Sequence, residues 1–147
     1  MRLRPIVVVE DADEDFDTIQ DAARLGGVVH PIARARSGAE CLRLLRSGQG
    51  TQGGRDAQTL LVLLDLNTPG DDGREVLRQM RCDDSLGLLP VVVLSASANA
   101  RDLQFCYANG ANAYHVKPVD HAVHLKVLQS IFAYWLGSVV LPSHNTN

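Results

Sequence analysis

The chain has 147 residues, 46% of them apolar and 21% charged, with a formal net charge of −3. These values predict a single globular domain and exclude a disordered or fibrous chain. The weak acidity argues against a nucleic acid partner, and no apolar run is long enough for a membrane span. An odd number of widely spaced cysteines favours neither a disulfide framework nor a zinc site, so we expect a cytoplasmic protein.

Short apolar runs alternate with segments of helical spacing. The runs predict five strands, at residues 5–9, 28–35, 59–64, 88–96 and 113–117. The first helix should place Phe16, Ile19 and Ala23 on its inner face and end at Gly26 and Gly27.

The second helix should begin at the capping box Ser37-Gly-Ala-Glu40, and Asp120 should cap the last helix. On their inner faces, the second helix should carry Leu42 and Leu45, and the third Val76, Leu77 and Met80. The fourth should carry Leu103 with Cys106 or Tyr107. Residues 46–58, rich in glycine and polar residues, predict an exposed loop.

This alternation predicts an α/β domain whose parallel sheet is covered on both faces, because strands buried on both sides form unbroken apolar runs. We expect one domain over residues 1–147, with its core at about 5–136 and a C-terminal arm at 137–147.

Chemically active residues follow the predicted strands. The first strand leads into Glu10 and Asp11, the third ends at Asp65, the fourth at Ser95 and the fifth at Lys117. Because functional groups of open parallel sheets gather at the carboxyl ends of the strands, we expect these five side chains to meet at one edge.

Most of these residues have an ordinary alternative interpretation. An acidic pair after a strand is often a solvated helix start, and a serine there is often structural. Asp65 is harder to explain in that way, because a carboxylate at the end of a buried strand needs a stabilising charge. Clustered carboxylates favour a hard cation such as Mg²⁺, and an aspartate can form an acyl phosphate as a nucleophile. The pattern therefore predicts that Asp65 is phosphorylated.

Four segments, "VEDADED", "LLDLNTPGDDG", "VVVLSAS" and "GANAYHVKP", resemble in order and spacing the receiver domain of bacterial two-component response regulators. The resemblance covers roughly residues 5 to 136. It implies a flavodoxin-like fold with strand order 2-1-3-4-5 and phosphotransfer from the histidine of a sensor kinase.

The resemblance also implies roles for individual residues. Asp65 would be the phosphoacceptor, Lys117 its phosphoryl partner, Ser95 the switch hydroxyl and Tyr114 the switch aromatic residue. Mg²⁺ would be held by Glu10, Asp11, Asp65 and the backbone carbonyl of Asn67. The bond between Lys117 and Pro118 would be cis. The chain would have no enzymatic activity beyond the self-phosphorylation and self-dephosphorylation of the family.

Within that family, "DLNTPGDDGREVL" and "YWLGSVVLP" are most similar to the stand-alone regulators that partner bacterial phytochrome kinases. Two alternatives stand beside the receiver. The stretch "DLNT" is also similar to the haloacid-dehalogenase phosphatases, although Asn67 replaces their second aspartate. A receiver that serves only as an adaptor is disfavoured, because every chemical residue is present.

The last helix predicts self-association. His124, Leu128, Ile131, Phe132 and Trp135 form the stripe expected to face the sheet. A second apolar set extends into the arm: Val123, Val127, Tyr134, Val139, Val140 and Leu141. We expect a homodimer in which this set and the arm meet the partner. The alternative is that residues 137 to 141 fold back over their own subunit.

Overall fold

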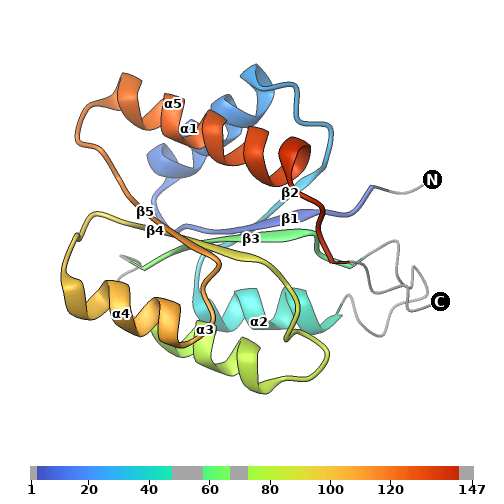
Figure 1. Ribbon diagram of the computed structural model, residues 1–147. Helices are drawn as coiled ribbons and strands as arrows, with labels where there is room; N and C mark the ends of the chain where they lie inside the picture. Colours follow the sequence, from blue (N-terminus) through green and yellow to red (C-terminus); the bar gives the residue numbers. More distant parts are fainter. Residues whose placement is uncertain (1–2, 48–57, 67–72, 143–147) are drawn as a thin grey trace.

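The computed structural model describes residues 3–47, 58–66 and 73–142, along which five strands alternate with five α-helices (Figure 1). The strands are β1 (Ile6–Val9), β2 (Ile32–Ala35), β3 (Leu61–Asp65), β4 (Val91–Ser95) and β5 (Ala113–Val116). The helices are α1 (Asp13–Leu25), α2 (Gly38–Ser47), α3 (Gly73–Cys82), α4 (Ala100–Ala108) and α5 (His121–Ala133), and α5 continues into a π-helical turn, η2 (Tyr134–Ser138).

All five strands pair in parallel in the order β2-β1-β3-β4-β5, which confirms the predicted flavodoxin-like topology. Val9 at the end of β1 lies between Ala35 of β2 and Leu64 of β3. Asp65 of β3 lies beside Leu94 of β4. The carboxyl ends of the strands therefore share one edge of the sheet, where binding sites of such folds form.

Helices α1 and α5 cover one face of the sheet, and α2, α3 and α4 cover the other (Figure 1). Successive residues of a strand point to opposite faces. In β1, Ile6 and Val8 accordingly pack in the cluster under α1 and α5, whereas Val7 and Val9 pack in the cluster under α2 and α3. Burial on both faces explains why this strand is an unbroken apolar run.

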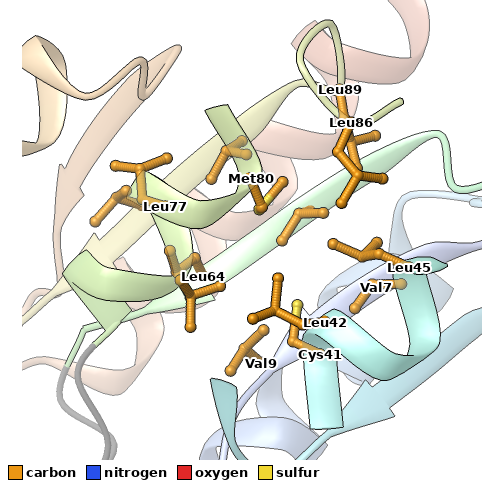
Figure 2. Close-up of a cluster of buried hydrophobic side chains, with 14 of the residues drawn as sticks. Val7, Val9, Cys41, Leu42, Leu45, Leu64, Leu77, Met80, Leu86 and Leu89 are labelled. Carbon is orange, nitrogen blue, oxygen red and sulfur yellow. The ribbon is translucent and has the colours of Figure 1, made fainter. Parts of the chain in front are cut away.

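Figure 2 shows how α2 and α3 hold the sheet from one side. Leu42 and Leu45 of α2 and Leu77 and Met80 of α3 point into one buried cluster with Leu64 of β3. Burying each such side chain contributes about 1.5–3 kcal/mol relative to leaving it in water. This packing fixes β3, and with it the position of the residue that ends the strand.

The helix signals in the sequence are confirmed. The backbone N–H of Glu40 donates to Ser37 Oγ over 3.1 Å, and the Asp120 side chain caps α5 in the same way. Cys106 is the buried inner residue of α4, while Tyr107 is exposed. None of the helices in the described ranges combines the length and apolar character that a bilayer span requires.

Every strand is shorter than predicted, β2 and β4 by the most. β2 begins at Ile32 instead of residue 28, because Gly27 turns the chain with φ +71° and Pro31 has no N–H to donate to a ladder. β4 covers residues 91–95 instead of 88–96. Most of the loop predicted at 46–58 lies outside the described residues.

Candidate functional site

Two buried carboxylates lie side by side at the carboxyl edge of the sheet. Glu10 follows β1 and Asp65 ends β3, and the pairing of Val9 with Leu64 puts them on adjacent strands. Only 1% of Glu10 and 3% of Asp65 is exposed. Burying an ionised carboxylate is costly unless a cation compensates it.

The compensating cation is Lys117, which follows β5. Its Nζ lies 2.8 Å from Asp65 Oδ2, 3.3 Å from Glu10 Oε1 and 3.6 Å from Asp15 Oδ2. The backbone N–H of Lys117 donates to the Ser95 carbonyl over 2.7 Å, so pairing with the adjacent strand holds the lysine in place. The structure therefore brings together Glu10, Asp65 and Lys117, three of the residues that the sequence singled out.

The electrostatics of this group favour added positive charge. The pKa of Glu10 is raised to about 8, first by burial, then by its hydrogen bond with Asp65 and the charge of that residue. Burial lowers the pKa of Lys117, but its hydrogen bond to Asp65 and the nearby acidic charges outweigh this effect, and the pKa is raised. Without a further cation, the Glu10 carboxyl group therefore binds a proton more tightly than a carboxyl group in water does.

The acidic residues could hold a metal ion. Oxygens of Glu10, Asp15 and Asp65 lie within 4.8 Å of one another. A set of oxygen donors only suits a hard divalent cation such as Mg²⁺. The raised pKa of Glu10 is a second sign of fit, because a divalent cation would relieve the repulsion among these carboxylates.

Asp15 was not predicted from the sequence. This residue lies in the first turn of α1, and its carboxylate reaches the ammonium of Lys117. Asp11, which the resemblance implied as a ligand, precedes the helix, is half-buried and is not in the group of three. The sequence did contain a signal for Asp15, because it lies four residues after Asp11, about one helical turn away. Asn67, the other implied ligand, lies outside the described residues.

Arg34 of β2 also bears on the site and was not predicted. Its Nε donates to the backbone carbonyl of Glu10 over 2.9 Å, and its Nη1 donates to Asp13 Oδ1 over 2.8 Å. The guanidinium carbon lies 4.6 Å from the centre of the Phe16 ring. Hydrogen bonds from Arg34 and then from Arg36 lower the pKa of Asp13. Asp13 is thus engaged by arginines, whereas Asp15 turns toward the lysine.

The two predicted switch residues contact the same loop between β4 and α4. Ser95 is buried at the end of β4, and its Oγ accepts the backbone N–H of Ser97 over 3.1 Å. The Tyr114 hydroxyl donates to the carbonyl of Ser97 over 2.8 Å, and its ring packs against the core. Ser95 and Tyr114 are therefore linked through Ser97.

One implied feature is wrong. The peptide bond between Lys117 and Pro118 is trans, and no peptide bond among the described residues is cis. Before proline the trans form is favoured by about 0.5–1 kcal/mol.

A pH dependence of stability follows from Glu10. Because folding raises its pKa from 4.5 to about 8, the folded protein binds this proton more tightly than the unfolded chain. In EDTA, the free energy of unfolding should therefore fall as the pH rises through this range, by at most about 5 kcal/mol. Glu10→Gln cannot ionise and should flatten the profile. Urea unfolding at a series of pH values measures both proteins.

Glu14→Gln is the matched control, because it removes an exposed carboxylate from α1. This variant should keep the wild-type profile. Equal slopes for the wild type and Glu10→Gln would contradict the raised pKa of Glu10.

The chain is similar to response regulators of phytochrome systems. The response regulator Rcp1 of Synechocystis is 33% identical over 138 residues, which span 94% of this chain and 92% of that protein. The crystal structure of the phosphorylated cyanobacterial phytochrome response regulator RcpA has a TM-score of 0.85 and 35% identity, and the match covers 96% of this chain and 99% of RcpA. The Mn²⁺-bound form of Rcp1 has a TM-score of 0.84 and 32% identity, with coverage of 95% and 99%.

A family match agrees with these relatives. Residues 6–129, which include all five strands and most of α5, match the response regulator receiver domain. Acidic residues at the sheet edge, where this family binds divalent metal, include Glu10 and Asp65. The matched residues, the strand order and the buried carboxylates beside a lysine agree, and the chain belongs to the response regulator receiver family.

Proposed function

We propose that the chain is a single-domain response regulator that accepts a phosphoryl group on Asp65 from a sensor histidine kinase. The observation that carries the proposal is the buried Asp65 carboxylate at the open edge of the sheet, 2.8 Å from the ammonium of Lys117. The names of the relatives support a kinase in a phytochrome-type light-sensing pathway. We expect this transfer in the cytoplasm, the compartment that the cysteine usage favours.

The chemistry is one displacement at phosphorus. An oxygen of Asp65 attacks the phosphorus of a phosphohistidine, the P–N bond breaks, and the leaving imidazole nitrogen takes a proton. Lys117 already lies against this carboxylate, so its ammonium can bind an oxygen of the transferred group and stabilise its charge. We expect no enzymatic activity beyond self-phosphorylation from small donors and self-dephosphorylation.

We assign Glu10, Asp11, Asp65 and the backbone carbonyl of Asn67 to Mg²⁺ binding. When bound, this ion would neutralise charge on the phosphoryl oxygens. Asp15 adds a further carboxylate to the group. The support is the oxygen-only donor set and the raised pKa of Glu10.

The switch uses the loop between β4 and α4. A phosphoryl group adds nearly two negative charges and three acceptor oxygens. The Ser95 hydroxyl accepts the N–H of Ser97 but still has its own proton to donate to such an oxygen. A shift of this loop would also move Tyr114, whose hydroxyl is hydrogen-bonded to the Ser97 carbonyl. We therefore expect phosphorylation to change the surface formed by α4, β5 and α5.

The same surface is our proposed homodimer interface, together with the C-terminal arm, residues 137–147. Val123 and Tyr134 are 48% and 51% exposed, and Val140 in the arm is 95% exposed. A groove of about 440 Å³ between β5 and α5 includes Tyr134 and Trp135 in its lining. Apolar side chains gathered in this way typically mark an interface, and a two-fold pair is its simplest closed form.

Asp65→Asn should abolish phosphorylation and preserve the fold. The amide has nearly the volume of the carboxylate and can still accept a hydrogen bond from Lys117, but it lacks the nucleophilic oxygen. Intact mass after incubation with Mg²⁺ and acetyl phosphate should show a phosphoryl adduct on the wild type and none on the variant. Asp84→Asn, at an exposed acid, is the control. An acid-labile, hydroxylamine-sensitive phosphate on Asp65→Asn would rule out this assignment.

Asp11→Asn should weaken Mg²⁺ binding at least about tenfold, because even residues outside the coordination sphere commonly change metal affinity by that factor. Calorimetric titration with MgCl₂ measures the affinity. Asp15→Asn in parallel determines whether the carboxylate of α1 that reaches the lysine is also needed. Asp13→Asn is the control, because its carboxylate binds Arg34 and Arg36. An unchanged affinity in Asp11→Asn, or an equal loss in Asp13→Asn, would contradict the assignment of Asp11.

Truncation after Leu136 should convert a dimer at roughly tens of micromolar into a monomer. Within the arm, Val139 and Leu141 are already half-buried in one subunit, so Val140 is the residue we expect to cross. Val140→Asp should therefore dissociate the dimer without shortening the chain. Leu88→Asp, at an exposed leucine in the connection between α3 and β4, is the control. Sedimentation that finds a wild-type monomer, or dimers of all variants, would disprove the role of the arm.

A further inference from the structure

Helix α4 is held largely by polar contacts at its two ends. Of its nine described residues, Cys106 alone is buried, whereas α1 buries five residues. A helix with few apolar contacts can be displaced locally at a low cost in free energy. The hydrogen bonds that position α4 therefore matter more than those of its neighbours.

Tyr114 of β5 forms hydrogen bonds with the loop before this helix and with its last turn. Its hydroxyl donates to the carbonyl of Ser97, two residues before the N-cap Asn99 of α4. Its backbone N–H donates over 3.1 Å to the hydroxyl of Tyr107, in the last turn of α4. Because β5 is an edge strand, the N–H groups on its outer side have no strand to pair with, and Tyr107 supplies the acceptor.

The connection from α4 to β5 is held by hydrogen bonds that do not involve the Tyr107 hydroxyl. Gly110 turns the chain with φ +93°, and Arg81 of α3 donates to its carbonyl from Nε over 3.0 Å and from Nη2 over 2.6 Å. The N–H of Ala111 closes the end of the helix on the carbonyl of Cys106 over 2.9 Å. A substitution at Tyr107 therefore leaves the turn itself in place.

At the other end, hydrogen bonds run without a break from the sheet edge to the helix. The N–H of Ser97 donates to Ser95 Oγ, the N–H of Asn99 donates to Ser97 Oγ, and the N–H of Arg101 donates to Asn99 Oδ1. Any movement of Ser95 is thus passed to the first turn of α4 and, through Ser97, to Tyr114.

We propose that Tyr107 is a positioning residue of the switch, whose hydroxyl holds the end of α4 on the backbone of Tyr114 and so transmits movements of the Ser95 loop to the whole helix. This inference rests on the proposed phosphorylation of Asp65. With the bond in place, α4 moves as one body with Tyr114. Without the Tyr107 hydroxyl, the remaining hydrogen bond of Tyr114 is with Ser97 in the loop before the helix, and less of the movement reaches the outer surface of α4.

Tyr107→Phe tests this role, because it removes one oxygen and keeps the ring. Hydrogen exchange resolved by residue with nuclear magnetic resonance should show the Tyr114 amide exchanging roughly two- to tenfold faster, the range expected for one hydrogen bond. After treatment with acetyl phosphate and Mg²⁺, the exchange rates across residues 97–108 should change at least about twofold less than in the wild type, while Asp65 is still phosphorylated.

Asp102→Asn is the control, because it breaks the 2.6 Å ion pair of α4 with Arg74 and leaves the tyrosine contact intact. It should not accelerate exchange at Tyr114. Equal exchange of this amide in the wild type and Tyr107→Phe, or an undiminished response of the helix to phosphorylation, would overturn the inference. A wild-type chain that takes up no phosphate would instead refute the proposed function, and the exchange of the Tyr114 amide would still decide whether Tyr107 holds it.

Discussion

The attraction between the Lys117 ammonium and the buried carboxylates of Glu10 and Asp65 is the interaction on which the functional edge depends. Burying such charges costs several kcal/mol per ion, and a pair repays this only with close contacts. Here the contacts are 2.8 and 3.3 Å. One ammonium facing several carboxylates still leaves the edge short of positive charge, and after burial the hydrogen bond with Asp65 and its charge raise the pKa of Glu10 further. The same excess of acidic groups that destabilises the fold without a metal ion favours the binding of a cation at this edge.

The pairing of these charges requires the whole sheet. Lys117 is 52 residues from Asp65 and 107 residues from Glu10 in the chain. Parallel pairing brings the carboxyl ends of the strands to one edge, and the order β2-β1-β3-β4-β5 puts β1 beside β3. The apolar clusters on both faces keep this register, since a slip by one residue would move each side chain of a strand from one cluster to the other. The core therefore acts on function by fixing where each strand ends.

The elements beyond the edge differ in how firmly they are held. Helices α1 and α5 pack tightly against each other and the sheet, with Leu128, Ile131 and Phe132 of α5 buried. Helix α4 contributes little to the core and is connected to the edge by hydrogen bonds through Ser97. Signalling motions are expected in elements of low local stability, because moving them breaks few apolar contacts. In this fold α4 meets that condition.

The sequence by itself determined the fold class and the residues at the sheet edge. Apolar runs with the period of buried strands, separated by capped helices, leave few topologies open, and a charged residue at the end of such a run is conspicuous. Asp65, Glu10, Lys117 and Ser95 were found for that reason. Only the tertiary structure decided that Asp15 joins the acidic group, that Arg34 and Arg36 engage Asp13, and that Tyr107 reaches the backbone of Tyr114. These features depend on the direction of single side chains across contacts between elements, which residue spacing along the chain does not specify.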